Sequence, residues 1–281
     1  MRTQGEARTA ATLRLRGGAD PGTAALDAEV LLAFALGVTK ETLLAHPERP
    51  LSADAAARFD ALIARRRQGE PVAYLRGWKE FYGLRIRVDP RVLIPRPETE
   101  TLVEAARRVI AGRPAVVVDV GTGSGAIACA IAVHEPLVRV IGLDVSRDAL
   151  AVAESNALSL GVADRVELRE GDLLAPISEP VDVVCANLPY LRDDALIDLT
   201  GDRTSLRFEP RSAVAAGGEG LDLIRRAAND LRRVLGPGGT ALFECDPPQA
   251  EIVAAMLASI GLSPRIVADL SGAARVVVGH A

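Results

Sequence analysis

The stretch Asn187-Leu188-Pro189-Tyr190 joins side chains that could bind a polar ligand to a residue that ends a strand. The preceding residues 181–185 are branched or small and almost free of charge, which predicts a strand buried on both faces. Pro189 cannot donate to a ladder and favours an extended residue before it. Asn187 is therefore expected at a strand's carboxyl end, where open α/β sheets bind ligands. An ordinary turn that follows a strand would have the same sequence pattern.

A glycine-rich segment lies between a predicted strand, Ala115–Val120, and a helix that ends near Val133: Asp119-Val120-Gly121-Thr122-Gly123-Ser124-Gly125. The glycines would allow a sharp turn close to a ligand, and the helix would offer its N-terminal N–H groups. The third glycine comes one residue earlier than in the dinucleotide fingerprint, which disfavours a dehydrogenase. Taken alone, the segment could also be a plain tight turn.

Two carboxylates follow at the ends of the next two predicted strands. Asp144 ends the strand at 139–143, where an acid could accept both hydroxyl protons of a ribose. Asp172 follows the strand at 165–169 and could accept a hydrogen bond from an adenine amine. Each acid alone is more often a turn aspartate. A glycine loop and two acids at three successive strand ends together predict a nucleotide-like ligand.

From residue 99 onward, predicted helices and strands alternate, which favours a doubly wound, mostly parallel sheet in an α/β domain. The remaining helices are expected at Glu100–Ile110, 148–160, 221–235 and about 249–260. The remaining strands are expected at 240–244, after a turn at 236–239, and at 275–278.

The first seventy or so residues predict a small helical bundle, because apolar residues recur at helical spacing over 27–45 and Ala53–Arg67. Ser52 is a plausible cap for the second of these helices. Alternating apolar and charged residues between Tyr74 and Pro97 predict a short hairpin. We therefore expect a helical domain at 1–73, a hairpin linker at 74–98 and an α/β domain at 99–281.

Composition limits the classes of function. The chain has 281 residues, 49% hydrophobic and 25% charged, with no apolar stretch long enough to span a bilayer and no apolar centre of a signal peptide near its start, so we expect a cytoplasmic protein. The net charge of −4 argues against coating nucleic acid through phosphate contacts alone. Arg65-Arg66-Arg67 could form a local basic patch, although such a triplet is usually a solvated helix face.

Cysteines and histidines form no recognisable site. The cysteines are far apart and lie in apolar surroundings, which predicts small buried side chains and neither a disulfide framework nor a metal cluster: Cys129, Cys185 and Cys245. The histidines are equally scattered: His46, His134 and His280. We expect no metal and no histidine-based mechanism.

The ordered motifs resemble those of class I S-adenosylmethionine-dependent methyltransferases that act on planar nitrogens. Upstream segments resemble one branch, the peptide chain release factor glutamine-N5 methyltransferases: Arg66-Arg67-Gln68-Gly69-Glu70-Pro71, Tyr74-Leu75, Lys79-Glu80-Phe81-Tyr82-Gly83-Leu84 and Leu93-Ile94-Pro95-Arg96-Pro97-Glu98-Thr99-Glu100. The resemblance covers about residues 26–279. It implies a seven-stranded Rossmann-like methyltransferase sheet with an N-terminal helical bundle joined by a β-hairpin.

The resemblance also implies a cofactor, a substrate and residue roles. The cofactor would be S-adenosyl-L-methionine, and the substrate the glutamine of the Gly-Gly-Gln loop of release factors, with no membrane and no stable nucleic-acid partner. Gly121 to Gly125 would line the methionine part, Asp144 the ribose, and Asp172 with Leu173 the adenine. The methyl group would face the corner at 187–190, where Asn187 and the carbonyl of Leu188 would receive the two protons of the target amide. Pro189 shapes this corner, and Tyr190 would give the amide a flat wall.

The sequence departs from this family at two places. Leu188 stands where proline is usual, which keeps the backbone carbonyl and adds an N–H. Asn-Leu-Pro-Tyr also occurs in ribosomal RNA adenine dimethyltransferases. In Glu244-Cys245-Asp246-Pro247-Pro248-Gln249, the family tends to have a glycine after the glutamate, and the sequence assigns this segment no role.

Three alternatives remain beside a release factor methyltransferase. A ribosomal-protein glutamine methyltransferase would share the motifs but differ in its recognition domain. An adenine-N6 methyltransferase acting on nucleic acid would need basic grooves and stacking aromatics, whereas aromatics are 3% of the residues. A cofactor-binding protein without catalysis would need a damaged site, and Asn187 and Pro189 are intact.

Overall fold

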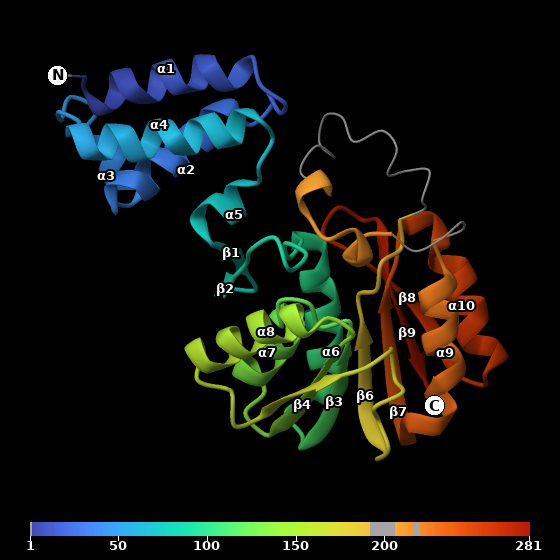
Figure 1. Cartoon of the computed structure of the whole chain (residues 1–281). Coiled ribbons are helices and arrows are strands. Elements are labelled where there is room, and N and C mark those ends of the chain that lie inside the picture. Colours follow the sequence, from blue (N-terminus) through green and yellow to red (C-terminus); the bar gives the residue numbers. More distant parts are fainter. Residues whose placement is uncertain (1, 192–205, 216–219) are drawn as a thin grey trace. The chain divides into compact units, whose positions relative to one another are not determined.

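The computed structural model describes residues 2–191, 206–215 and 220–281 (Figure 1). The described chain divides into two compact units: the first contains residues 2–78 together with residues 206–208, and the larger one contains residues 79–191 and 209–281. In the described part, the first unit is helical and the second is built around a seven-stranded sheet.

The predicted helical bundle is present in the N-terminal unit. Its helices are α1 (Gln4–Arg16), α2 (Ala24–Leu36), α3 (Lys40–Ala45), α4 (Ala53–Arg67) and α5 (Val72–Arg76). Ser52 caps α4 as predicted, because its side chain accepts a hydrogen bond from the Ala55 N–H. The continuous helix expected over 27–45 is wrong, because Gly37 adopts a left-handed conformation, with φ of 67°, and ends α2 there.

Arg65 and Arg67 of the arginine triplet are exposed, as expected of a solvated helix face, whereas Arg66 is buried. Its side chain is 6% exposed, and its Nε donates to Asp27 Oδ2 at 2.7 Å. It also forms an ion pair with Asp20. Arg66 shares a helix face with the buried residues Phe59 and Ile63, which lie seven and three residues before it. Arg66 therefore has a structural role in the helical unit, where its buried side chain joins α4 to Asp20 and Asp27.

A two-stranded hairpin follows, formed by β1 (Trp78–Phe81) and β2 (Leu84–Arg87). The two turn residues, Tyr82 and Gly83, have φ values of 51° and 73°. Two successive positive φ angles are typical of the tight turn that suits the twist of a hairpin. The predicted hairpin is therefore present.

The larger unit contains the predicted doubly wound, mostly parallel sheet, with the strand order β5-β4-β3-β6-β7-β9-β8. Its strands are β3 (Ala115–Val120), β4 (Val138–Asp144), β5 (Val166–Glu170), β6 (Val181–Ala186), β7 (Leu235–Glu244), β8 (Ser263–Ala268) and β9 (Ala274–His280). Strands β3 to β7 pair in parallel, and β9 is antiparallel to both of its neighbours.

Helices cover both faces of this sheet (Figure 1). The chain moves from β3 through β4 to β5 in one direction and from β6 to β7 in the other, and right-handed crossovers in opposite directions place their helices on opposite faces. The order reverses between β3 and β6, which is where such sheets bind ligands. The helical elements are η1 (Pro97–Thr99), α6 (Glu100–Ile110), α7 (Ala126–His134), α8 (Arg147–Ser159), η4 (Arg211–Ala213), α9 (Asp222–Val234), η5 (Pro247–Gln249) and α10 (Ala250–Ser259).

Two details of the sheet differ from the sequence prediction. The expected turn at 236–239 lies inside β7, where the pairing with β6 changes register as at a β-bulge. Strand β8 was not predicted, because it contains Pro264 and its side chains are mostly exposed. An edge strand tolerates proline, since one row of its N–H groups has no ladder to serve.

The centre of the sheet is buried on both faces, as residues 183–186 show with exposures of 2% or less. The cysteines are buried side chains, as predicted: Cys129, Cys185 and Cys245. Within the described ranges, histidine, cysteine and acidic side chains do not gather in groups of three that could hold a metal. Of the helices that the structure describes, none is long and apolar enough to cross a bilayer.

Candidate active site

A cavity of about 300 Å³ opens at the carboxyl ends of the parallel strands. Many of the residues singled out from the sequence line it: Gly121, Gly123, Asp144, Asp172, Leu173, Asn187, Leu188 and Pro189. The chain therefore brings together three strand ends and the Asn187 corner in one place. The lining also includes residues that sequence reasoning missed, among them Arg91, Val92, Pro210 and Ser212.

Thr122 and Ser124 shape the glycine-rich loop and are themselves buried. The Thr122 hydroxyl donates to Asp119 Oδ2 at 2.6 Å, and the Ala128 N–H reaches the same oxygen at 3.2 Å. The Ser124 carbonyl accepts from the side-chain amide of Asn156 at 2.8 Å. Thr122, Ser124 and the Gly125 position are not among the residues that line the cavity.

Asp119 is fully buried at the end of β3. Burial raises its pKa to about 6, and the negative charge of Asp144 raises it as well. Its Oδ1 has no hydrogen-bond partner among the described residues. Asp119 therefore binds the Thr122 hydroxyl and the Ala128 N–H through Oδ2 alone.

Two glycines of the loop are required by both conformation and space. Gly121 has φ of 71°, and a Cβ there would lie 3.1 Å from the side chain of Leu188. Gly125 has φ of 76°, and a Cβ there would lie 3.0 Å from Ala153 in α8. A side chain at either place would strain the backbone and crowd its neighbour.

Asp144 connects the loop to the next helix. Its Oδ2 accepts from the Gly123 N–H and its Oδ1 from the Ser146 N–H, each at 2.9 Å. A carboxylate can accept about four hydrogen bonds, so Asp144 retains acceptor capacity toward the cavity it lines.

The third strand end is more exposed. Asp172 forms an ion pair with Arg226 of α9, and both side chains are more than half exposed. The next residue, Leu173, has φ of 49° and is buried. Such a backbone angle is uncommon outside glycine and is often found at functional sites.

The corner after β6 is held by side chains. Asn187 Nδ2 donates to Thr99 Oγ1 at 3.0 Å, so the amide oxygen lies on the other side of the group. Tyr190 does not line the cavity; its hydroxyl lies 3.4 Å from Glu244 Oε1. Burial and the charge of Glu244 raise the pKa of Tyr190.

The segment at 93–100, which carried the family resemblance, ties several parts of the larger unit together. The Ile94 N–H donates to Glu209 Oε2 at 3.1 Å, and Arg96 forms an ion pair with the same buried carboxyl. Glu100 accepts from the Tyr82 N–H at 2.8 Å. The segment thus fixes the hairpin turn and, through Thr99, the Asn187 corner.

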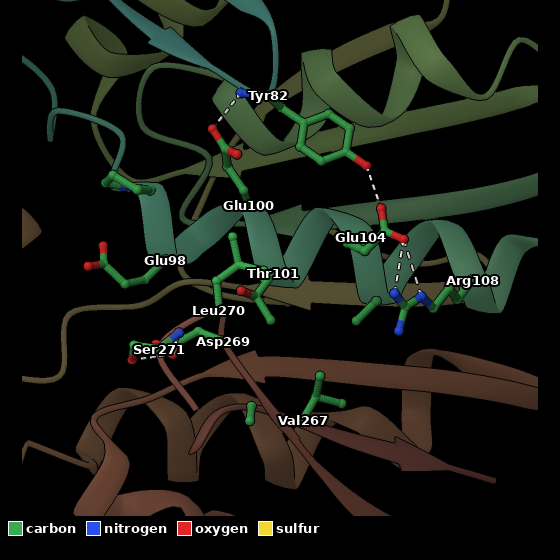
Figure 2. A pocket seen from close by; sticks show the side chains of 13 residues that line it. Tyr82, Glu98, Glu100, Thr101, Glu104, Arg108, Val267, Asp269, Leu270 and Ser271 are labelled. Atoms are coloured by element: carbon green, nitrogen blue, oxygen red, sulfur yellow. Dashed lines mark hydrogen bonds and ion pairs between the residues drawn. The ribbon is translucent and has the colours of Figure 1, made fainter. Parts of the chain in front are cut away.

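A second cavity, of about 450 Å³, lies beside α6 (Figure 2). Two of its acidic side chains bond within the protein: Glu100 and Glu104 to Tyr82, and Glu104 to Arg108 as well. None of the residues predicted as site residues lines this larger cavity. We therefore assign the candidate site to the smaller one.

Comparison with known proteins gives the family. Residues 6–77 match the family model described as "PrmC N-terminal domain", and residues 113–250 match "Methyltransferase domain". The release factor glutamine methyltransferase of Cereibacter sphaeroides is 41% identical over 255 residues, which is 90% of both chains. That of Koribacter versatilis is 42% identical over 267 residues, 93% of both.

The chain belongs to the release factor glutamine methyltransferase family. This confirms the resemblance inferred from the motifs. Bordetella pertussis provides a further relative of the same name, 42% identical over 93% of this chain and 97% of its own.

Solved structures agree on the fold. A methyltransferase from Pyrococcus furiosus superposes with a TM-score of 0.51 at 16% identity, over 72% of this chain and 91% of that one. The hMettl16 catalytic domain superposes with a TM-score of 0.55 at 14% identity, over 80% and 81% of the two chains. At such identities these matches establish the methyltransferase fold alone.

Proposed function

We propose that this protein transfers a methyl group from S-adenosyl-L-methionine to the side-chain amide nitrogen (N5) of the glutamine in the Gly-Gly-Gln motif of peptide chain release factors. The observation that carries the proposal is the Asn187 amide, anchored by Thr99 at the edge of the cavity. It stands in a chain of the release factor glutamine methyltransferase family.

The cavity residues fit this cofactor. Gly121 and Gly123 would line its methionine part, and the spare acceptor capacity of Asp144 suits the two ribose hydroxyls. Asp172 and Leu173 would border the adenine. When bound, S-adenosylmethionine supplies a methyl group on a positively charged sulfur.

Asn187 and Leu188 would prepare the target nitrogen. A carboxamide nitrogen is a poor nucleophile, because its lone pair is delocalised into the carbonyl. Asn187 Oδ1 and the Leu188 carbonyl would accept its two hydrogens, orient it and stabilise the positive charge that grows on it. The methyl group replaces one hydrogen, which leaves as a proton once the nitrogen has become cationic and acidic.

The direct test supplies the protein with labelled S-adenosylmethionine and, separately, release factor, ribosomes and ribosomal RNA. Mass spectrometry should place the label on the glutamine of the Gly-Gly-Gln motif, and a release factor with that glutamine replaced by alanine should stay unlabelled. Label confined to RNA or to a ribosomal protein would refute the proposal in favour of the alternatives. Because release factors act on ribosomes, the proposal places the protein in the cytoplasm.

We also propose that the N-terminal unit recognises the release factor. All residues proposed for the cofactor follow residue 120, whereas the N-terminal unit exposes several large apolar side chains: Leu13, Leu26, Phe34, Val38 and Leu44. Exposed apolar surface is typical of sites that bind protein partners. Replacing Phe34 and Val38 together by serine should raise the KM for the release factor and leave the Kd of the cofactor unchanged. An unchanged KM would contradict this role.

A further inference from the structure

Three segments that are far apart in the sequence line the candidate cavity and bond to one another. They are residues 91–99, residues 187–191 and residues 209–215. The cavity is lined by residues 91–93 of the first segment, by residues 187–189 of the second, and by Pro210, Ser212 and Ala213 of the third. The shape of the cavity therefore depends on how these three segments are held together.

Two of the joins between these segments involve residues 187–191. The Asn187 side chain donates to Thr99 Oγ1 at 3.0 Å, which joins the second segment to the first. Leu191 pairs with Ala215 in an isolated parallel bridge, which joins the second segment to the third. The remaining join is the one between residues 91–99 and residues 209–215.

Glu209 makes this third join with both oxygens of its carboxyl group. Oε2 accepts from the Ile94 N–H at 3.1 Å, and Oε1 forms an ion pair with Arg96. The Glu209 side chain is 0% exposed. Contacts to a charged acceptor are stronger than those between neutral groups, and a buried charge that loses its partner is costly. Glu209 therefore closes a ring of contacts among the three segments.

The contacts of Glu209 lie directly beside the lining of the cavity. Leu93, which precedes Ile94, and Pro210, which follows Glu209, both line it. We propose that Glu209 is a positioning residue, which holds residues 91–93 and 210–213 at the spacing that the cofactor requires. Walls that are fixed before binding cost less free energy to order when the ligand binds. This inference rests on the proposed function.

The contact should act on cofactor affinity more than on the methyl transfer itself. Thr99, which anchors Asn187, is buried with 3% exposure and lies in η1, directly before α6. Its position is therefore fixed by a helix and does not depend on Glu209. Loss of the Glu209 contact should weaken cofactor binding and spare the rate of the saturated enzyme, whereas a general loss of structure would lower both.

The test uses two single variants, their combination and one control. Glu209→Gln keeps an oxygen for the Ile94 N–H but loses the charge that pairs with Arg96, and Arg96→Met removes the other half of the ion pair. Glu135→Gln is the matched control. Glu135 is also buried and paired with an arginine, Arg107, whose side chain is 32% exposed like that of Arg96, but neither residue lines the cavity.

Three quantities are measured for every variant: the Kd of S-adenosylmethionine by calorimetry, the single-turnover rate of release factor methylation at saturating cofactor, and thermal unfolding. Glu209→Gln and Arg96→Met should each raise the Kd about tenfold and leave the saturated rate within about threefold of the parent. Because both act through one contact, the double variant should also lose about tenfold in affinity, rather than about a hundredfold. Glu135→Gln should keep the parental Kd.

Three results would overturn the inference: a parental Kd in Glu209→Gln, an equal loss of affinity in Glu135→Gln, or additive losses in the double variant. A parent that binds the cofactor and labels the release factor leaves the proposed function standing in each of these cases. If the parent itself does not bind S-adenosylmethionine, the proposed function fails and takes this inference with it.

Discussion

The two sides of the cavity are built in different ways. On the β3–β4 side, Asp144 holds backbone N–H groups from 21 and two residues away in sequence. On the β6–β7 side, Asn187 is held by a side chain 88 residues away, and Tyr190 by one 54 residues away. The first side is formed largely by local sequence, whereas the second exists only after the sheet has assembled.

The two sides also differ in electrostatics. Asp144 is partly exposed and keeps acceptor capacity for a ligand, whereas Glu244 is buried with a pKa raised to about 7. We therefore expect substitutions on the β3–β4 side to change cofactor affinity. Substitutions at the Asn187 corner on the β6–β7 side should change the methylation rate.

The largest effect is expected at Asn187. Asn187→Ala removes a preorganised acceptor that acts as charge develops, which typically costs about a hundredfold to a thousandfold in rate. Single-turnover methylation should show this loss, while calorimetry should show a cofactor Kd close to that of the parent. A parent-like rate would reduce the corner to a simple turn.

Glu244→Gln should change stability in a pH-dependent way. The folded pKa of about 7 lies above the ordinary value of 4.5, so between these values the folded state holds a proton that the unfolded state has released. The unfolding free energy of the parent should therefore fall as pH rises from about 4.5 to about 7, by at most about 3 kcal/mol. Urea unfolding at both ends of this range should show a smaller fall for the variant. Equal falls in both proteins would mean that Glu244 does not titrate there.

Asp144→Ala should weaken cofactor binding by about 1.5–3 kcal/mol, or about tenfold to a hundredfold, because a charged acceptor is lost. Asp144→Asn is the control for the loop, since it keeps an oxygen for one of the two backbone N–H groups. Calorimetry should rank the affinities as parent, asparagine, alanine. Unchanged affinity in both variants would make Asp144 an ordinary turn residue.

The smallest effect is expected for Leu188→Pro. The carbonyl that would accept from the target amide is kept, and only an N–H is removed. We expect the single-turnover rate to change by less than about fivefold, or about 1 kcal/mol. A larger loss would show that the N–H of Leu188, or the packing of the Leu188 side chain near Gly121, is needed.

Much of the β3–β4 side could be predicted from the sequence. Glycines, a strand end and an acid are local patterns, and the carboxyl ends of parallel strands must meet at one edge. Asn187 follows another of these strand ends and lines the cavity as well. The sequence did not predict the position of Tyr190, which turns toward Glu244, because the partner of a side chain after the proline is set by a distant strand.

The rest depended on tertiary structure. Thr99 and Glu244 belong to motifs that the sequence revealed only as a resemblance, and their contacts join segments far apart in the chain. Two omissions had local signals. The start of α1 carries a capping box of Thr3 and Glu6, and Arg66 falls on the buried face of α4. The charge of Arg66 suggested a side chain exposed to solvent, although a charged side chain can be buried when it is paired.

The most direct test asks whether the β3–β4 side sets cofactor affinity and the Asn187 corner on the β6–β7 side sets the methylation rate. It measures two quantities on the same preparations of Asn187→Ala and Asp144→Asn: the single-turnover rate at saturating S-adenosylmethionine, and the Kd of that cofactor. We expect opposite effects from the two substitutions. Asn187→Ala should lose most of its rate at nearly parental affinity, and Asp144→Asn should lose affinity while its saturated rate stays within a few-fold of the parent. If both substitutions weaken the affinity alike and leave the saturated rate intact, Asn187 only helps to hold the cofactor, and the proposed role of the corner is wrong.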